Sequence, residues 1–178
     1  MRRSTLRFLL GALALSACSE PNVPACATQI AEDVCSTPAQ LRGAEPVSAS
    51  ASGVAIALPP SPLAEGRYVL ASRSTSCAPG AAESLPASVQ GVLEVRGCVL
   101  RRTLVSEPEP ARVEVFELGY ADDEGVLALQ RRCPEEEAGA LRASYGSDGV
   151  SIELGRLQAS DESTEVPDCD TLDTWELR

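Results

Sequence analysis

From Gly66 to the end of the chain, apolar residues recur at every second position in short runs. Tyr68 and Leu70 share one face of the run RYVLAS, and Leu127 and Leu129 share one face of GVLALQRRC. Alternation with a period of two over short runs is typical of half-buried β-strands. We therefore predict that residues 66–178 form an all-β domain.

The same alternation recurs along the rest of this region. The residues that it places on shared faces are Leu93 with Val95, Leu100 with Leu104, Val113 with Val115, Phe116 with Leu118 and Tyr120, Leu141 with Ala143 and Tyr145, Val150 with Ile152 and Leu154, and Trp175 with Leu177. The links ADDEG and GSDG between runs have the composition of hairpin turns. EPEPA separates two more runs, because proline cannot donate to a strand ladder. We expect an antiparallel up-and-down meander of seven to eight strands that closes into a barrel, since closure removes exposed edges.

The number of strands depends on Gly97. If Gly97 forms a tight turn, eight strands follow Arg67; if it is a bulge, one long strand crosses it. With the bulge, Cys77 and Cys98 lie across one hairpin, and Cys133 and Cys169 lie near one end of the barrel. With the turn, Cys98 lies at the opposite end from the other three.

The N-terminus has the layout of an export signal. Three arginines occur in the first seven residues, residues 8–15 are apolar, and two small residues follow. The apolar run is shorter than the about 20 residues that a membrane-spanning helix needs. Leu15-Ser16-Ala17-Cys18 resembles the lipobox of bacterial lipoproteins, which implies removal of residues 1–17 and lipidation of Cys18. The alternative is an ordinary signal peptide that leaves Cys18 as one more thiol.

The residue after Cys18 bears on the location of the protein. It is Ser19 and not Asp, which in Gram-negative lipoproteins resembles the pattern that directs transfer to the outer membrane. We expect a protein of the cell envelope that is attached to the outer membrane by its N-terminal lipid.

The cysteine count agrees with export. The chain has seven cysteines, and six remain if Cys18 carries lipid. An even number in an exported chain predicts disulfides, and six cysteines allow 15 connectivities. We favour the sequential set, Cys26–Cys35, Cys77–Cys98 and Cys133–Cys169, because each bond closes a modest loop. A zinc site is disfavoured, because no two cysteines have the close spacing of a zinc knuckle and the chain has no histidine.

Residues 18–65 have a different texture, rich in Pro, Ala and Ser. Such a composition is typical of a tether between a lipid anchor and a folded domain. The segment between Cys26 and Cys35 could form a helical turn closed by a local disulfide. The alternation of Val54, Ile56 and Leu58 suggests a strand added to the domain that follows.

Composition excludes several chemistries. Histidine is absent and all 15 basic residues are arginine, so a Ser-His-Asp triad, a Walker-type phosphate loop and a lysine Schiff base cannot be built. Removal of residues 1–17 leaves 12 arginines against 26 acidic residues, a net charge of −14. This negative charge disfavours binding to nucleic acid, because such binding depends on neutralising the phosphates. The acidity suits a solvated exported surface or a basic partner.

Some of the quoted runs also carry a resemblance to a known group. Gly66-Arg67-Tyr68, then GVLEVRGCVL, GVLALQRRCP, GVSIEL and the terminal TWELR resemble small bacterial lipoproteins with lipocalin-like, calycin-type β-barrels. There a Gly-x-Tyr strand opens the barrel and an aromatic strand closes it. The chain lacks the opening Gly-x-Trp of better-known lipocalins, and its Trp175 lies in the last run instead.

An eight-stranded barrel is either filled by its own side chains or holds one small ligand. The residues that we expect to line this barrel are Tyr68, Leu70, Tyr145, Ile152 and Trp175. We expect the other inward residues to be aliphatic, with no polar cluster that faces a ligand. The carboxylates of ADDEG, CPEEE and SDEST are expected at the solvated surface, where Arg101-Arg102 and Arg131-Arg132 can pair with them across strands.

We therefore predict a non-enzymatic exported lipoprotein whose barrel binds a small apolar ligand or an envelope component. The alternative is an inhibitor or interaction module for a cationic protein, because small acidic lipoproteins with disulfide-bonded barrels include inhibitors of lysozyme. No catalytic residue, metal ligand, cofactor or nucleic-acid partner is predicted. The sequence leaves the oligomeric state open.

Overall fold

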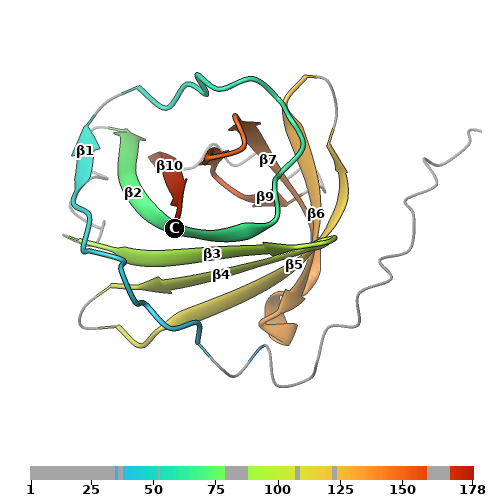
Figure 1. The fold of residues 1–178 in the computed structure, drawn as a ribbon, viewed down its shortest axis with the longest axis horizontal. Coiled ribbons are helices and arrows are strands. Elements are labelled where there is room, and N and C mark those ends of the chain that lie inside the picture. Colours follow the sequence, from blue (N-terminus) through green and yellow to red (C-terminus); the bar gives the residue numbers. More distant parts are fainter. Residues whose placement is uncertain are drawn as a thin grey trace, which may run out of the picture.

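The protein is an all-β domain in which one sheet closes on itself (Figure 1). The computed structural model describes residues 35, 38–51, 53–78, 88–106, 109–121, 124–159 and 169–178. The elements in these ranges are β1 (Ala49–Ala51), β2 (Gly66–Cys77), β3 (Gln90–Arg96), β4 (Val99–Val105), β5 (Arg112–Ala121), β6 (Val126–Cys133), the 3-10 turn η3 (Glu135–Glu137), β7 (Gly139–Ser147), β8 (Ser151–Gly155), β9 (Gln158–Ala159) and β10 (Cys169–Leu177).

Eight of the strands form the closed barrel. Strands β2 to β8 and β10 lie next to one another in the order β2-β10-β8-β7-β6-β5-β4-β3, and every one of these neighbouring pairs is antiparallel. β2 also pairs with β3, from Gly66 opposite Val95 to Val69 opposite Val92, which completes the ring. The short β9 continues beside β7 beyond the end of β8. The predicted all-β antiparallel meander and its closure are confirmed.

Gly97 is a turn and not a bulge. It has a φ of 55°, in the left-handed region that favours glycine, and Arg96 and Val99 face each other on either side of it. The barrel therefore has eight strands. The turn also fixes the direction of β3 and β4, so that Cys98 lies at one end of the barrel and Cys133 at the other.

We call these the Gly97 end and the Cys133 end. The β3–β4, β5–β6 and β7–β8 connections lie at the Gly97 end, where GSDG and ADDEG join antiparallel strands as predicted. β6 ends and β7 begins at the Cys133 end, and η3 connects them there. β2 ends and β10 begins at the same end, with Cys77 opposite Cys169.

Most of the barrel interior is filled by apolar side chains. The core cluster contains Tyr68, Leu70, Val89, Leu93, Val95, Leu100, Phe116, Leu127, Leu129, Leu141, Ala143, Tyr145, Ile152, Leu154 and Trp175. The indole of Trp175 reaches from β10 toward β3, where a Cβ on Gly91 would lie 3.0 Å from two of its ring carbons. Tyr68, Phe116 and Trp175 have no exposed area. No space as large as a water molecule therefore borders these three side chains.

Two residues that the alternation placed with inward neighbours lie at the surface instead. Val150 is 58% exposed and Leu177 is 41% exposed. Val150 lies in the turn between β7 and β8, and Leu177 is the last residue of β10. The alternation holds inside the strands but does not extend into their ends.

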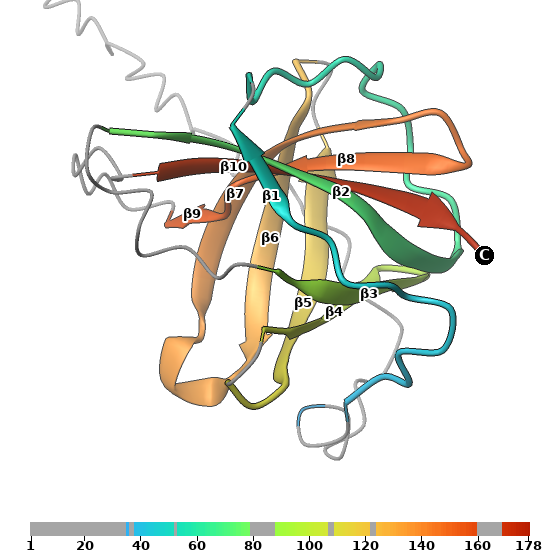
Figure 2. The ribbon, with the colours of Figure 1, turned by 90° about the vertical axis from the view of Figure 1, so that its left-hand side faces the viewer.

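Residues 38–51, which we call the strap, lie across the outside of the barrel (Figure 2). Ala39 and Ala44 pack against the outward Val69 and Val92, and the backbone N–H of Ala39 donates to Thr103 Oγ1 at 3.1 Å. The strap ends in β1, which pairs in parallel with the second half of β2. Much of the segment expected to be a tether is therefore part of the domain surface.

The strap and the segment after it contact the barrel at two further places. Val47 forms a backbone bridge with Val89 just before β3, so the strap lies beside both β2 and β3 near the Cys133 end. Farther on, the backbone N–H groups of Ala57 and Leu58 donate to Glu153 Oε2 at 2.6 and 2.9 Å. The strand suggested by Val54, Ile56 and Leu58 is not present; the added strand is β1.

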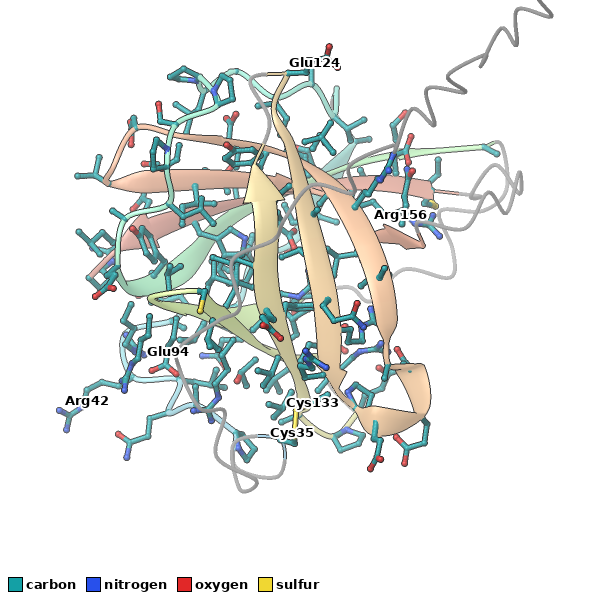
Figure 3. The ribbon with its side chains drawn as sticks, turned by 90° about the vertical axis from the view of Figure 1, so that its right-hand side faces the viewer. Cys35, Arg42, Glu94, Glu124, Cys133 and Arg156 are labelled. Atoms are coloured by element: carbon teal, nitrogen blue, oxygen red, sulfur yellow. A yellow bond between two sulfur atoms is a disulfide. The ribbon has the colours of Figure 1, made fainter. Side chains whose placement is uncertain are left out.

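The disulfides differ from the predicted sequential set. Cys35 is bonded to Cys133 and Cys77 is bonded to Cys169, and Figure 3 shows the first of these pairs near the end of β6. Cys98 is disulfide-bonded as well. The predicted Cys77–Cys98 bond was wrong because it depended on a bulge at Gly97, and the predicted Cys26–Cys35 bond was wrong because Cys35 is bonded to Cys133. The turn at Gly97 moves Cys98 away from Cys77, which instead faces Cys169 on the neighbouring strand.

Candidate functional site

Charged side chains point into the barrel at the Cys133 end. On β4 and β5, Arg102 and Glu114 are opposite each other, two residues from the buried Leu100 and Phe116. Successive side chains of a strand alternate between faces, so Arg102 and Glu114 share the inner face with these core residues. Arg131 joins them from β6, where it is paired with Phe116. The prediction of a purely apolar lining was therefore wrong at this end.

Glu114 is at the centre of this group, and its side chain is only 2% exposed. Its Oε2 accepts hydrogen bonds from Arg102, with Nη2 at 2.5 Å and Nε at 2.7 Å. Its Oε1 lies 3.3 Å from Arg112 Nε and 3.3 Å from Arg131 Nη2. Three guanidinium groups thus converge on one buried carboxylate.

A second carboxylate bridges two of the same arginines nearer to solvent. Glu137 Oε2 is 2.6 Å from Arg112 Nη2 and 2.5 Å from Arg131 Nη1. Glu137 is the last residue of η3, the turn that connects β6 to β7. We call Arg102, Arg112, Glu114, Arg131 and Glu137 the arginine cluster.

Phe116 lies under the arginine cluster. The guanidinium carbons of Arg102 and Arg131 are 5.9 and 5.7 Å from the centre of its ring. A cation over an aromatic face is attracted by the ring quadrupole. The ring therefore separates the charged end of the interior from the apolar core and stabilises two of the three positive charges.

The electrostatics keep Glu114 ionised. Burial by itself raises the pKa of this carboxyl group, but the charge and hydrogen bonds of Arg102 and the charges of Arg112 and Arg131 outweigh burial and hold its pKa below the ordinary value. The formal charges of the five side chains are three positive, from the arginines, and two negative, from the glutamates. The cluster therefore keeps a net positive charge within an acidic protein.

A second ion pair lies inside the barrel between β2 and β10. Arg73 donates to both carboxylate oxygens of the buried Asp173, at 2.6 and 2.7 Å. Asp173 faces Arg73 across the strands, and the register shifts between Thr174 and Trp175. The ion pair is bidentate and its charges cancel, which suits a structural role.

The outer surface also has a hollow of about 380 Å³ near β7, β8 and the start of β10. Its walls include Arg142, Ser144, Arg156 and Asp170, and Val54 borders it. Arg156 donates to the carbonyl oxygen of Cys169 at 2.6 Å. The hollow thus has scattered polar groups on its walls, whereas the arginine cluster directs three guanidinium groups at one carboxylate.

The structure places the residues singled out from the sequence in two settings. The expected lining residues Tyr68, Leu70, Tyr145, Ile152 and Trp175 all belong to the apolar core cluster. Cys35, Cys77, Cys133 and Cys169 are in the two disulfides at the Cys133 end. Cys18 and Cys26 are outside the described residues.

The arginine pairs expected at the surface divide between the two faces of the sheet. Arg132 is half-exposed and pairs with Glu117 on the outside, as expected of a surface ion pair. Arg102 and Arg131 belong to the inner cluster instead. The signal for their position was available, because Arg102 is in phase with Leu100 and Leu104, and Arg131 with Leu127 and Leu129.

Within the described residues, no group of three or more His, Cys, Asp or Glu side chains is placed to hold a metal ion. The same part of the chain has no helix long and apolar enough to cross a membrane. Comparison with protein-family models, with curated proteins and with solved structures finds no match to this chain. The fold and the arginine cluster are therefore the features of this chain that bear on its function.

Proposed function

We propose that the protein is a non-enzymatic exported lipoprotein, anchored through a lipid on Cys18, whose barrel is a rigid binding module of the cell envelope. The signal-like N-terminus and its lipobox support the anchor. The disulfides Cys35–Cys133 and Cys77–Cys169 support export, because such bonds persist in oxidising compartments. The closed barrel of eight strands is the architecture that the resemblance to lipocalin-like lipoproteins implies.

The filled interior limits where such a module can bind a partner. Tyr68, Phe116 and Trp175 belong to the apolar core of the barrel and have no exposed area, and Gly91 leaves just enough room for the indole. A buried apolar ligand would need to displace these side chains. We therefore propose that the partner is an envelope component that contacts the ends or the outside of the barrel.

A cationic protein is the second candidate partner, and the distribution of charge favours it. The described residues contain 15 acidic residues and all 12 arginines that follow Cys18, and the other segments after Cys18 contain the remaining 11 acidic residues and no arginine. Uncompensated acidic segments attract a cationic protein and raise its association rate. A complex with a cationic protein such as lysozyme that weakens steeply with salt would support this candidate.

The proposed anchor is tested by expressing the chain with its own N-terminus and comparing Cys18→Ser with Ser19→Ala, which keeps the cysteine. We expect the wild type and Ser19→Ala to fractionate with membranes and to show acyl mass on a chain that starts at residue 18. Cys18→Ser should be soluble or unprocessed. Equal membrane partitioning of Cys18→Ser and wild type would contradict the anchor.

The same preparation tests the binding mode. Under gentle ionisation, the protein should show no small apolar molecule bound inside it. A stoichiometric apolar cargo that is lost on denaturation would contradict the filled interior.

A further inference from the structure

We propose that Arg112 and Arg131 form a binding site for the carboxylate group of a small organic anion, and that Glu137 occupies this site when the ligand is absent. The inference goes beyond the proposed function, because it names a ligand class and a site, and it holds for the barrel whether or not Cys18 is lipidated.

Glu137 already shows which chemistry the site accepts. One of its carboxylate oxygens is within 2.6 Å of both Arg112 Nη2 and Arg131 Nη1. Arginine presents a planar fork of N–H donors that matches a carboxylate. The Nε of Arg131 is buried and has no hydrogen-bond partner among the described residues, so Glu114 and Glu137 together leave this guanidinium group incompletely paired.

The site is open to solvent on the side of Glu137. The side chains of Arg112 and Glu137 are 53% and 43% exposed, whereas that of Arg131 is 12% exposed. A ligand can therefore approach from the mouth of the barrel and meet one exposed and one nearly buried guanidinium group. It does not need to enter the filled apolar core.

Glu137 is held in a way that allows exchange. It belongs to a three-residue turn that has no buried residue and no side-chain cap. Its ion pair with Arg112 is half-exposed on both sides, and such pairs contribute little net stability, because solvent screens them and the side chains lose freedom. A ligand carboxylate can replace Glu137 without breaking the buried contacts between Glu114 and Arg102.

The charges favour an anion once Glu137 has moved away. The three arginines and Glu114 then carry a net charge of +2, because Glu114 stays ionised among them. Phe116 lies beneath Arg131 and limits how deep a ligand can go. The site should therefore prefer a flat carboxylate, which can accept two parallel hydrogen bonds, over a spherical anion such as chloride.

The test compares acetate binding to the wild type and to Glu137→Gln, in which the neutral amide competes less well for the arginines. Glu136→Gln is the matched control, because this residue is exposed on the same turn. Arg112→Ala should abolish binding, and Arg132→Ala is its control, since Arg132 pairs with Glu117 on the outer face. Binding is followed by NMR at the arginine Nε–H groups. Because the chain has no lysine or histidine, every basic side chain that can bind acetate is an arginine.

We expect Glu137→Gln to bind acetate roughly two- to tenfold more tightly than the wild type, as estimated from the loss of its ion pairs with the half-exposed Arg112 and the nearly buried Arg131. The signal of Arg131 should shift, and chloride at equal ionic strength should not reproduce the effect. The single indole signal of Trp175 reports that each variant is folded. Equal acetate affinity of Glu137→Gln and Glu136→Gln, or equal competition by chloride, would overturn the proposal.

Discussion

Replacement of Glu114 by glutamine should destabilise the barrel strongly. Glutamine has the same shape, but it removes the charge that three arginines face and turns an amide NH₂ toward one of them. Glu114 is 2% exposed, and the side chains of Arg102 and Arg131 are 13% and 12% exposed, so solvent compensates little. Removal of one partner from a buried ion pair costs about 3–5 kcal/mol. Because Arg112 is half-exposed, we expect the lower end, about 3 kcal/mol.

The assay is equilibrium unfolding in urea at pH 7, with Glu117→Gln as the control. Glu117 and its partner Arg132 have side chains that are 21% and 51% exposed, so this control should lose less than about 1 kcal/mol. The double variant Arg102→Met/Glu114→Leu should be more stable than Glu114→Gln, since apolar pairs often replace buried ion pairs without loss. A Glu114→Gln protein as stable as Glu117→Gln would show that the charge of Glu114 does not stabilise the barrel.

The loss of unfolding free energy caused by Glu114→Gln should also depend on pH. The pKa of Glu114 is lowered in the folded protein from its ordinary value of 4.5, so the folded state holds this proton less tightly than the unfolded state. The stabilisation is therefore fully present above the ordinary value and is lost as the pH falls through the folded value. The difference in unfolding free energy between wild type and Glu114→Gln should be constant near neutral pH and shrink in acid.

Two further predictions concern packing and covalent structure. Gly91→Val should cost about 1–3 kcal/mol by overpacking, because a Cβ added there would lie 3.0 Å from Trp175 and Leu104. Gly139→Ala is the control and should be nearly neutral, because an added Cβ there meets nothing within 4 Å. Equal unfolding midpoints of the two variants would contradict the tight packing at Gly91. A non-reducing digest should give peptides joined by Cys35–Cys133 and Cys77–Cys169, and Cys35→Ser should lose on the order of 2–5 kcal/mol. Recovery of Cys133 linked to Cys169 would contradict this pairing.

The strands could be predicted from sequence because each one has its own alternation of apolar and polar residues. The antiparallel direction of the strands and the closure of the sheet into a barrel followed from the short hairpin links. The sequence allowed either a turn or a bulge at Gly97. The strap was not predictable in this way. Its Pro-, Ala- and Ser-rich segment has little alternation, and its contacts are with Val69 and Val92, which lie far away in the sequence.

The arginine cluster was only partly visible in the sequence. The phase of Arg102 with Leu100 and Leu104 indicates the inner face, but the preference of charged residues for solvent suggested the surface. Arg73 could not be placed, because the register shift between Thr174 and Trp175 changes which residues of β2 and β10 face inward. The role of Glu137 depends on a turn at the end of β6 that brings its carboxylate back over the barrel mouth.

Quenching of tryptophan fluorescence shows whether the interior of the barrel is filled. Trp175 is the single tryptophan of the chain, so its emission reports the barrel interior alone. We expect blue-shifted emission that acrylamide and iodide quench far less than in the urea-unfolded protein, because Trp175 has no exposed area. Ready quenching by acrylamide in the folded protein would instead show that solvent enters the barrel and that its interior is not filled.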